Sequence, residues 1–313
     1  MNTNLAPIIL FVYNRPEHTR KTLLALSENN LASESILYIY CDGITSDATA
    51  ELKVKNDLVK KVIKEQQWCK EVFIVESETN KGLANSVISG VTEIVNQYGK
   101  IIVLEDDLII ANSFLDYMNN ALNLYENSPE VIQVSGFSFP TPKIKATNSS
   151  YFLTLTSTWG WATWKSAWDT IDFECSDYVI LKKDKKLAHQ FNYKGSYNYK
   201  KMFLQQMESI KISSWGIRFY WNAFKQNAVV LFPDKSLVFN NGWDSTGKHK
   251  DSYDIFPMSD WDSIYKIKKF PELIKTDEKT NKIIARYLRK RTSIFTKALH
   301  RVLLILNKKL YLK

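Results

Sequence analysis

Ile101-Ile102-Val103-Leu104-Glu105-Asp106-Asp107 places four apolar residues directly before three acids. A continuous apolar run of this length is typical of a strand buried on both faces, as in a parallel sheet covered by helices. Three adjacent carboxylates at the end of such a strand repel one another and favour a bound cation. A divalent ion that also holds a diphosphate suits them, because hard cations take carboxylate and phosphate oxygens together. An acidic helix start ahead of Asn112-Ser113 is the alternative interpretation.

Three earlier apolar runs have strand length, and each precedes a segment whose apolar residues recur at helical spacing. The runs are Ile8–Val12, 36–40 and 72–75, and the helices are expected from Pro16 to about residue 29, over 52–63 and over 83–95. This alternation predicts an α/β fold, with a Rossmann-like, mostly parallel sheet and helices on both faces. Ligands bind beyond the carboxyl ends of such strands. The polar residues that follow the four runs are therefore expected to meet at one site: Asn14-Arg15, Asp42, Asn80-Lys81-Gly82 and Glu105-Asp106-Asp107.

The regular alternation is lost from about Pro129. Short strands are expected over Val131–Ser135, 151–155, 229–232 and 236–239, among Trp-rich segments that we interpret as helical, with Trp164 and Trp168 in the core. No Pro/Gly/Ser linker or repeat marks a boundary. We therefore expect one domain over residues 1–275, with a ligand-binding half (1–128), a second half for the acceptor substrate (129–275) and a separate tail (276–313).

The formal charge of +9 belongs to the tail. Residues 279–313 hold eleven Lys or Arg and no acid, which leaves the first 278 residues at −2. A nucleic-acid-binding fold would carry a basic stripe in its body, so nucleic acid is not expected as a partner. The tail alternates apolar and basic residues and predicts an amphipathic helix on an anionic membrane surface, or one packed on its own domain or on a second copy.

The remaining composition predicts a cytoplasmic protein. The start of the chain shows no pattern of a secretory signal, and no run approaches the ~20 apolar residues of a membrane span. The three cysteines are widely spaced and form no zinc or disulfide pattern, which favours a reducing compartment. With the basic tail, we expect a peripheral protein at the inner face of the cytoplasmic membrane. Lone His18, His189 and His300 are expected at the surface.

Several motifs, taken in order, resemble the GT-A-fold glycosyltransferases. They are Phe11-Val12-Tyr13-Asn14-Arg15-Pro16, Tyr40-Cys41-Asp42-Gly43, Asn80-Lys81-Gly82-Leu83, Val103-Leu104-Glu105-Asp106-Asp107-Leu108, Ser157-Thr158-Trp159-Gly160-Trp161-Ala162-Thr163-Trp164, Trp215-Gly216-Ile217-Arg218 and Asn241-Gly242-Trp243-Asp244-Ser245-Thr246-Gly247-Lys248-His249. They look like bacterial family-2-like sugar transferases of surface-polysaccharide synthesis, and are distantly similar to the N-acetylglucosaminyltransferase I family. The resemblance covers about residues 7–250.

This resemblance implies a nucleotide-sugar donor, in particular a UDP-sugar, and a Mn²⁺ or Mg²⁺ cofactor. The implied donor-binding residues are Tyr13, Asn14, Arg15, Asp42, Lys81, Glu105, Asp106, Trp161, Ser245 and Lys248. Within this set Asp42 would accept from the uridine base and Trp161 would lie under a sugar. Asp107 and His249 would hold the metal, in part from a loop (245–249) that closes over the diphosphate. The implied activity is hexosyl transfer to a cell-surface glycan or lipid-linked acceptor, of lipopolysaccharide or capsule type.

Inversion at the anomeric carbon needs a base for the acceptor hydroxyl. The resemblance implies an acid near Trp215, but Ser214-Trp215-Gly216-Ile217-Arg218 contains none. Asp244 and Glu208 are the candidates. Arg218 pairs either with a site carboxylate or acceptor phosphate, or in a structural contact. A catalytically degenerate nucleotide-sugar-binding protein therefore stays open. So does a sugar nucleotidyltransferase, although Tyr13-Asn14-Arg15-Pro16 is not the Gly-rich loop expected after its first strand.

Overall fold

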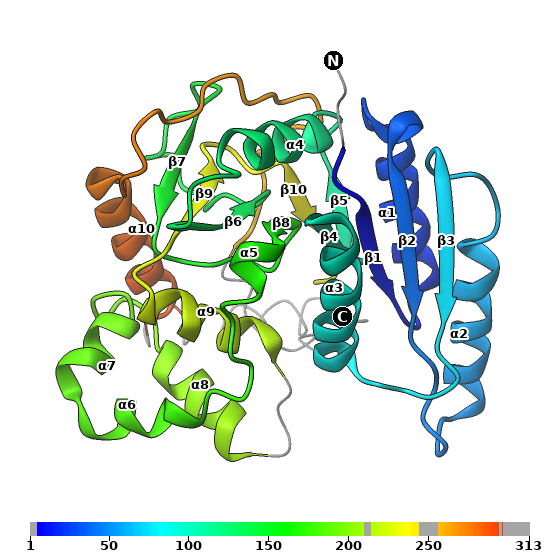
Figure 1. Cartoon of the computed structure of the whole chain (residues 1–313), viewed down its shortest axis with the longest axis horizontal. Helices are drawn as coiled ribbons and strands as arrows, with labels where there is room; N and C mark the ends of the chain where they lie inside the picture. The colour runs from blue at the N-terminus through cyan, green and yellow to red at the C-terminus, as the bar shows by residue number, and fades with distance from the viewer. Residues whose placement is uncertain (1–4, 210–213, 244–255, 294–295, 297–313) are drawn as a thin grey trace, which may run out of the picture.

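Among the described residues, eight strands form one mixed sheet in the order β3-β2-β1-β4-β8-β6-β9-β7 (Figure 1). The computed structural model describes residues 5–209, 214–243, 256–293 and 296. The strands of the large sheet are β1 (Ile8–Val12), β2 (Ile36–Cys41), β3 (Glu71–Glu76), β4 (Lys100–Glu105), β6 (Val131–Ser135), β7 (Ser150–Leu153), β8 (Trp161–Trp164) and β9 (Val229–Pro233). A separate two-stranded sheet pairs β5 (Leu108–Ile110) with β10 (Val238–Asn240).

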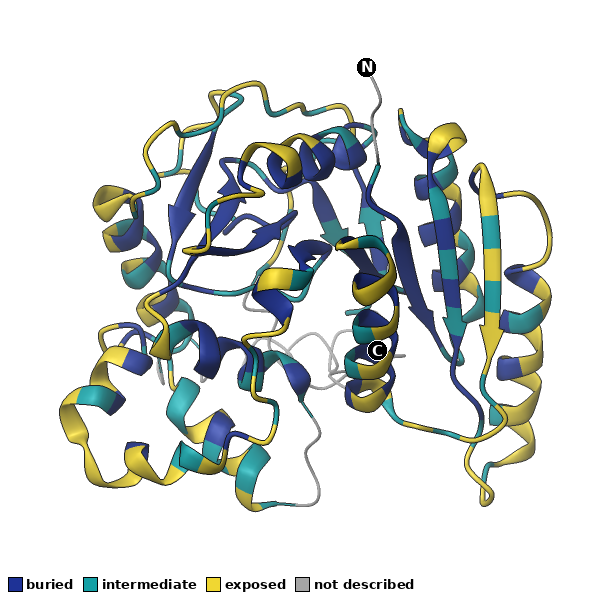
Figure 2. Cartoon of the chain, in the orientation of Figure 1, coloured by how far each residue is buried: buried dark blue, intermediate teal, exposed yellow. Residues whose placement is uncertain are grey.

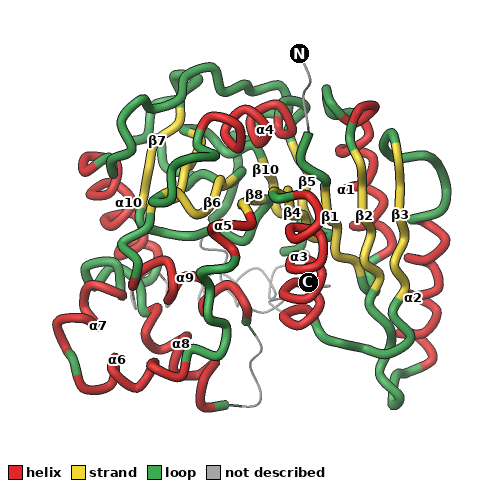
Figure 3. Tube along the Cα trace, in the orientation of Figure 1, coloured by secondary structure: helices red, strands yellow, loops and turns green. Residues whose placement is uncertain are grey.

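Helices lie on both faces of the large sheet, so the predicted α/β class is confirmed (Figures 1 and 3). They are α1 (Pro16–Ser27), α2 (Ala50–Val62), α3 (Leu83–Tyr98), α4 (Phe114–Leu124), α5 (Lys165–Trp168), α6 (Ile180–Lys183), α7 (Lys185–Phe191), α8 (Tyr199–Glu208), α9 (Trp215–Lys225) and α10 (Glu278–Arg291), with 3-10 turns at Ala32–Glu34 and Ser176–Val179.

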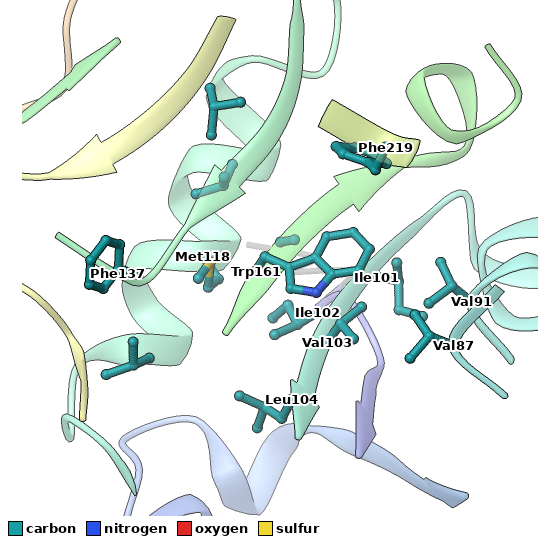
Figure 4. Packing of buried hydrophobic residues seen from close by; sticks show 14 of the residues in the cluster. Val87, Val91, Ile101, Ile102, Val103, Leu104, Met118, Phe137, Trp161 and Phe219 are labelled. Atoms are coloured by element: carbon teal, nitrogen blue, oxygen red, sulfur yellow. The ribbon is translucent and has the colours of Figure 1, made fainter. Parts of the chain in front are cut away.

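The first four strands of the large sheet are parallel, as the alternation predicts. β1 lies between β2 and β4, and all five of its residues are buried. Helix α3 packs directly on β1, because a Cβ added at Gly90 would lie 3.0 Å from Ile9 and 3.1 Å from Phe11. Figure 4 shows Val87 and Val91 of α3 beside Ile101 of β4. The sheet core therefore fixes the ends of β1 and β4 relative to each other.

In the second half of the chain, β8 differs from the prediction. We interpreted the Trp-rich segment as helical, but β8 is a strand that pairs antiparallel with both β4 and β6. Trp and Thr fit a pleated, buried surface, and all four of its residues are buried. The short helix α5 begins only at Lys165. Strands β6 and β9 run parallel to each other, and strand β7 is antiparallel to β9.

The first part of the tail forms helix α10, which packs on the domain. Its apolar face buries Ile284 and Leu288, and the ring of Tyr287 stacks on that of Phe256 with their centroids 6.4 Å apart. Tyr193 donates to Asn281, which ties the helix to the second half. Figure 2 shows the other side of α10 exposed. For residues 278–291 the described contacts fit the alternative of a helix packed on its own domain, because Ile284 and Leu288 are buried; residues 297–313 lie outside the described part. Within the described residues, no helix is long and apolar enough to span a bilayer.

Candidate functional site

Arg15 joins the ends of β1 and β4 at the point where the strand order switches. The chain leaves β1 toward β2 on one side and returns as β4 on the other. Such a switch leaves a crevice beyond the strand ends. There Nη2 of Arg15 pairs with Asp106 and, at 3.0 Å, with Oδ2 of Asp107. Thr22 of α1 fixes the turn by donating to the backbone oxygen of Asp106 at 2.9 Å.

The three acids at this point share one described cation. Burial, followed by the charges of Asp107 and Asp106, raises the pKa of Glu105 to about 8. Burial also raises the pKa of Asp106 to about 6, although Arg15 opposes the shift. Burial lowers the pKa of Arg15, but Asp106 and Asp107 outweigh it and hold this pKa above its usual range. The cluster therefore has a strong electrostatic preference for additional positive charge.

Asp42 joins the end of β2 to the start of α3. Its Oδ1 accepts from the N–H of Gly43 at 3.0 Å and of Lys81 at 2.9 Å, and its Oδ2 accepts from the N–H of Gly82 at 2.9 Å. A carboxylate has about four acceptor positions, so about one remains for a ligand. The side chain of Lys81 is exposed beside this contact. Asp42 is thus held rigidly while it keeps the capacity to accept one more hydrogen bond.

Asn56 connects the ends of β1 and β2, a role that the sequence reasoning missed. Its Nδ2 donates to the backbone oxygens of Tyr13 at 2.7 Å and of Asp42 at 3.1 Å. Asn56 is buried in α2, in the same helical stripe as Val59. A polar residue at a core position of an amphipathic helix was the signal that could have found it. Tyr13 and Asn14, both partly exposed, lie at this junction, and burial together with Asp42 and Asp47 raises the pKa of Tyr13.

Residues 240–243, which begin with the last residue of β10, lie against the carboxylates. The N–H of Asn241 donates to the backbone oxygen of Asp107 at 3.0 Å. Nε2 of His18 lies 3.3 Å from the backbone oxygen of Asn241. His18 is buried, which corrects the expectation of a surface residue; His189 is exposed as expected, and His300 lies outside the described residues. Asp244, Ser245, Lys248 and His249 also lie outside the described residues.

The residues at the end of β4 fit a divalent ion as part of its ligand set. Among the described residues, no three His, Cys, Asp or Glu side chains converge as a complete metal site. Asp107 pairs through Oδ2, and its Oδ1 has no hydrogen bond or ion pair with a described residue. Its side chain is 16% exposed. Asp107 can therefore offer one hard oxygen to Mn²⁺ or Mg²⁺, with a diphosphate supplying others.

Trp161 corrects a second expectation. Its indole is fully buried and stacks between Trp168, at 5.9 Å, and Trp215, at 5.0 Å. Figure 4 shows the ring between Phe219 and the side chains of Ile102 and Val103 of β4. A ring enclosed in this way cannot lie under a sugar. Trp164 and Trp168 are core residues, as expected.

Two further side chains of the second half make structural contacts. Glu208, at the end of α8, pairs with Lys182, and no described contact links it to Asp107 or Arg15. Arg218 donates to the backbone oxygens of Ser214 at 3.3 Å and of Phe173 at 3.0 Å. Its guanidinium also lies over the ring of Phe173. Of the two interpretations of Arg218, the described contacts fit the structural one.

No protein-family profile matches the chain, and no curated protein matches it by sequence. Among solved structures, it is similar to S. aureus TarS, with a TM-score of 0.41 and 12% identity over 77% of this chain and 37% of TarS. It is also similar to the galactosyltransferase LgtC in complex with donor and acceptor sugar analogs (TM-score 0.38, 9% identity, 72% of each chain) and to mouse xyloside xylosyltransferase 1 (TM-score 0.35, 9% identity, 71% of this chain and 82% of that one). The chain thus spans little more than a third of TarS.

Proposed function

We propose that the chain is a metal-dependent, inverting glycosyltransferase that uses a nucleotide-diphosphate sugar, in particular a UDP-sugar. The observation that carries this proposal is the meeting of Arg15, Asp106 and Asp107 at the β1–β4 switch, beside Asp42 at the end of β2. A nucleoside diphosphate sugar needs an acceptor for its base, hydrogen-bond acceptors for ribose and sugar hydroxyls, and positive charge for its phosphates. The strand ends offer hydrogen-bond acceptors for the base and for the hydroxyls, and their carboxylates bind the positive charge.

The residues divide the donor among them. Asp42 accepts from the base through its remaining acceptor position, and Tyr13, Asn14 and Lys81 line the nucleotide pocket. Glu105 and Asp106 accept from ribose and donor-sugar hydroxyls. Arg15 lies at the same strand ends and is charged, so it can hold a phosphate oxygen as well as the carboxylates.

Asp107 would hold Mn²⁺ or Mg²⁺ together with His249, and Ser245 and Lys248 are proposed to bind the nucleotide-sugar; these last three residues lie outside the described residues. When bound, the ion supplies positive charge for the leaving diphosphate, where negative charge develops during transfer. Asp107 contributes by holding a hard oxygen at a fixed place. Arg15 contributes by holding Asp107 and Asp106 in position.

The acceptor hydroxyl needs a base, and Asp244 is the residue we propose for it. Glu208 was the other sequence candidate, and its ion pair with Lys182 on α6 favours a surface role instead. We propose a cell-surface glycan of lipopolysaccharide or capsule type as the acceptor. Residues beyond 293 carry the remaining basic and apolar tail, which we propose contacts the inner face of the cytoplasmic membrane.

The test is incubation with a panel of UDP-sugars and Mn²⁺, for wild type, Asp107→Ala and the control Asp169→Ala. Asp169 is an exposed acid paired with Lys165. We expect sugar release or transfer by wild type and the control, and a loss of about 10³-fold in Asp107→Ala, since several kcal/mol of charge stabilisation would be removed. Binding of a UDP-sugar without turnover would favour the non-catalytic alternative. Release of pyrophosphate from a nucleoside triphosphate would favour the nucleotidyltransferase.

A further inference from the structure

The short sheet β5–β10 brings residues 240–243 onto the end of β4. Asn240 lies opposite Leu108 in the antiparallel register, so Asn241, which follows β10, is brought close to Asp107, which precedes β5. The N–H of Asn241 then donates to the backbone oxygen of Asp107. Residue 242 follows and lies against the Asp107 side chain. We call residues 240–243 the strap.

Gly242 leaves no room for a side chain at this contact. A Cβ at this position would overlap Oδ2 of Asp107 and would lie 3.1 Å from its Cγ. The same Cβ would lie 3.0 Å from Nη1 of Arg15. A Cβ at position 242 would therefore press on both partners of the ion pair, and the carboxylate of Asp107 or the guanidinium of Arg15 would have to move.

One hydrogen bond inside the strap and one from α1 hold it in place. The N–H of Gly242 donates to Oδ1 of Asn240 at 2.9 Å. The backbone oxygen of Asn241 can only accept, so the buried His18 of α1 donates to it from Nε2 at 3.3 Å. The strap is thus fixed between α1 and β5, and its contact with Asp107 is a built feature of the site.

We propose that Gly242 and His18 are positioning residues that set the orientation of the Asp107 carboxylate for a divalent cation bound with a nucleoside diphosphate. This inference rests on the proposed function. Residues that orient a metal ligand from behind typically change metal affinity by about 10- to 100-fold when they are replaced. Gly242 acts through space that it leaves open, and His18 acts through the backbone of Asn241.

The test is calorimetric titration of UDP into the full chain, with Mn²⁺ and again with EDTA, for wild type, Gly242→Ala, His18→Gln and Gly99→Ala. Gly99 is the matched control: it has a left-handed φ of 78°, and a Cβ there meets no atom within 4 Å. Gly99 caps the C-terminal end of α3, and Gly82, which donates to Asp42, caps the N-terminal end. Gly99→Ala therefore brings the strain of a Gly→Ala change at the end of the helix that lies away from the site. Thermal unfolding of all four proteins accompanies the titrations.

We expect Gly242→Ala to weaken UDP binding with Mn²⁺ by at least about tenfold, and His18→Gln by a smaller factor, with binding in EDTA unchanged within about twofold. Gly99→Ala should bind like wild type in both conditions. Should Gly242→Ala fail to fold, His18→Gln decides the question. Equal binding by wild type and the folded variants overturns the inference, and so does an equal loss with Mn²⁺ and with EDTA. No Mn²⁺-dependent binding by wild type overturns the proposed function, and the inference with it.

Discussion

The carboxylates at the ends of β2 and β4 differ in what satisfies them. Asp42, after β2, accepts from three backbone N–H groups, which belong to the chain's own turns. Asp107, after β4, pairs with one guanidinium and leaves Oδ1 without a described partner. Burial is similar, since Asp42 is 9% exposed and the side chain of Asp107 is 16% exposed.

Asp42 therefore stabilises the structure of the site, whereas Asp107 keeps an oxygen available for a ligand. Removal of Asp42 leaves three N–H groups without an acceptor, and each buried unsatisfied group costs about 1–3 kcal/mol. Removal of Asp107 relieves like-charge repulsion with Asp106 and Glu105 while it loses a single ion pair. Removal of Asp42 should therefore lower the free energy of unfolding much more than removal of Asp107.

The largest expected effect is on stability at the end of β2. Asp42→Asn puts an amide NH₂ against one of the three N–H groups, and we expect it to lower the free energy of unfolding by about 3 kcal/mol. Asp107→Asn should lower it by less than about 1 kcal/mol. Urea unfolding at neutral pH measures both. Equal losses for the two variants would remove the distinction between a structural and a ligand-binding acid.

Arg15 pairs with Asp107, whereas Asp42 accepts hydrogen bonds from backbone N–H groups. Arg15→Gln leaves Asp106 and Asp107 without their described cation, and we expect a loss of about 2 kcal/mol. Mn²⁺ should then raise the melting temperature of Arg15→Gln more than that of wild type, because the ion replaces the missing charge. The control is Arg20→Gln, which removes an exposed ion pair with Glu65. A Mn²⁺ response no larger than in wild type would contradict the account.

Trp161 extends the comparison to the second half of the chain, which supplies packing behind the site. Trp161→Phe keeps an aromatic ring but leaves a cavity among Trp168, Trp215 and Phe219, and we expect a loss of about 1.5 kcal/mol. Affinity for UDP with Mn²⁺ should change by less than about twofold. Unfolding curves and calorimetry test the two statements together. A large loss of affinity for UDP at unchanged stability would show that Trp161 contacts the ligand.

Glu208 gives the smallest expected effect. Glu208→Gln removes an exposed ion pair with Lys182, so stability should change by less than about 0.5 kcal/mol. Turnover should stay within about twofold of wild type. Lys182→Met, which removes the other partner, is the matched control. A rate that falls by orders of magnitude in Glu208→Gln alone would identify Glu208 as the base after all.

The first half was predictable because its signals are local. Each buried strand is a continuous apolar run, and each ends in polar residues that parallel pairing must bring to one edge. Arg15 and Asp107 could thus be placed together, although not in an ion pair, since pairing depends on side-chain directions at the turn. Asn56 was readable only as a polar residue on an apolar helix stripe.

The second half was harder because strand and helix compete for the same aromatic residues. Trp161 and Trp164 are three apart, which suits a helix turn, yet the open edge of β4 recruits this segment as an antiparallel strand. Tertiary pairing therefore outweighed spacing. The contact between Gly242 and Asp107 depends on the register of β5 with β10, and no local pattern in the sequence specifies that register.

The most direct test of the account is a crystal structure of the chain with UDP and Mn²⁺. We expect the ion on Asp107, the diphosphate between it and Arg15 beyond the ends of β1 and β4, and the uracil base on Asp42. A nucleotide bound elsewhere, or bound at this edge with the metal away from Asp107, would contradict the account.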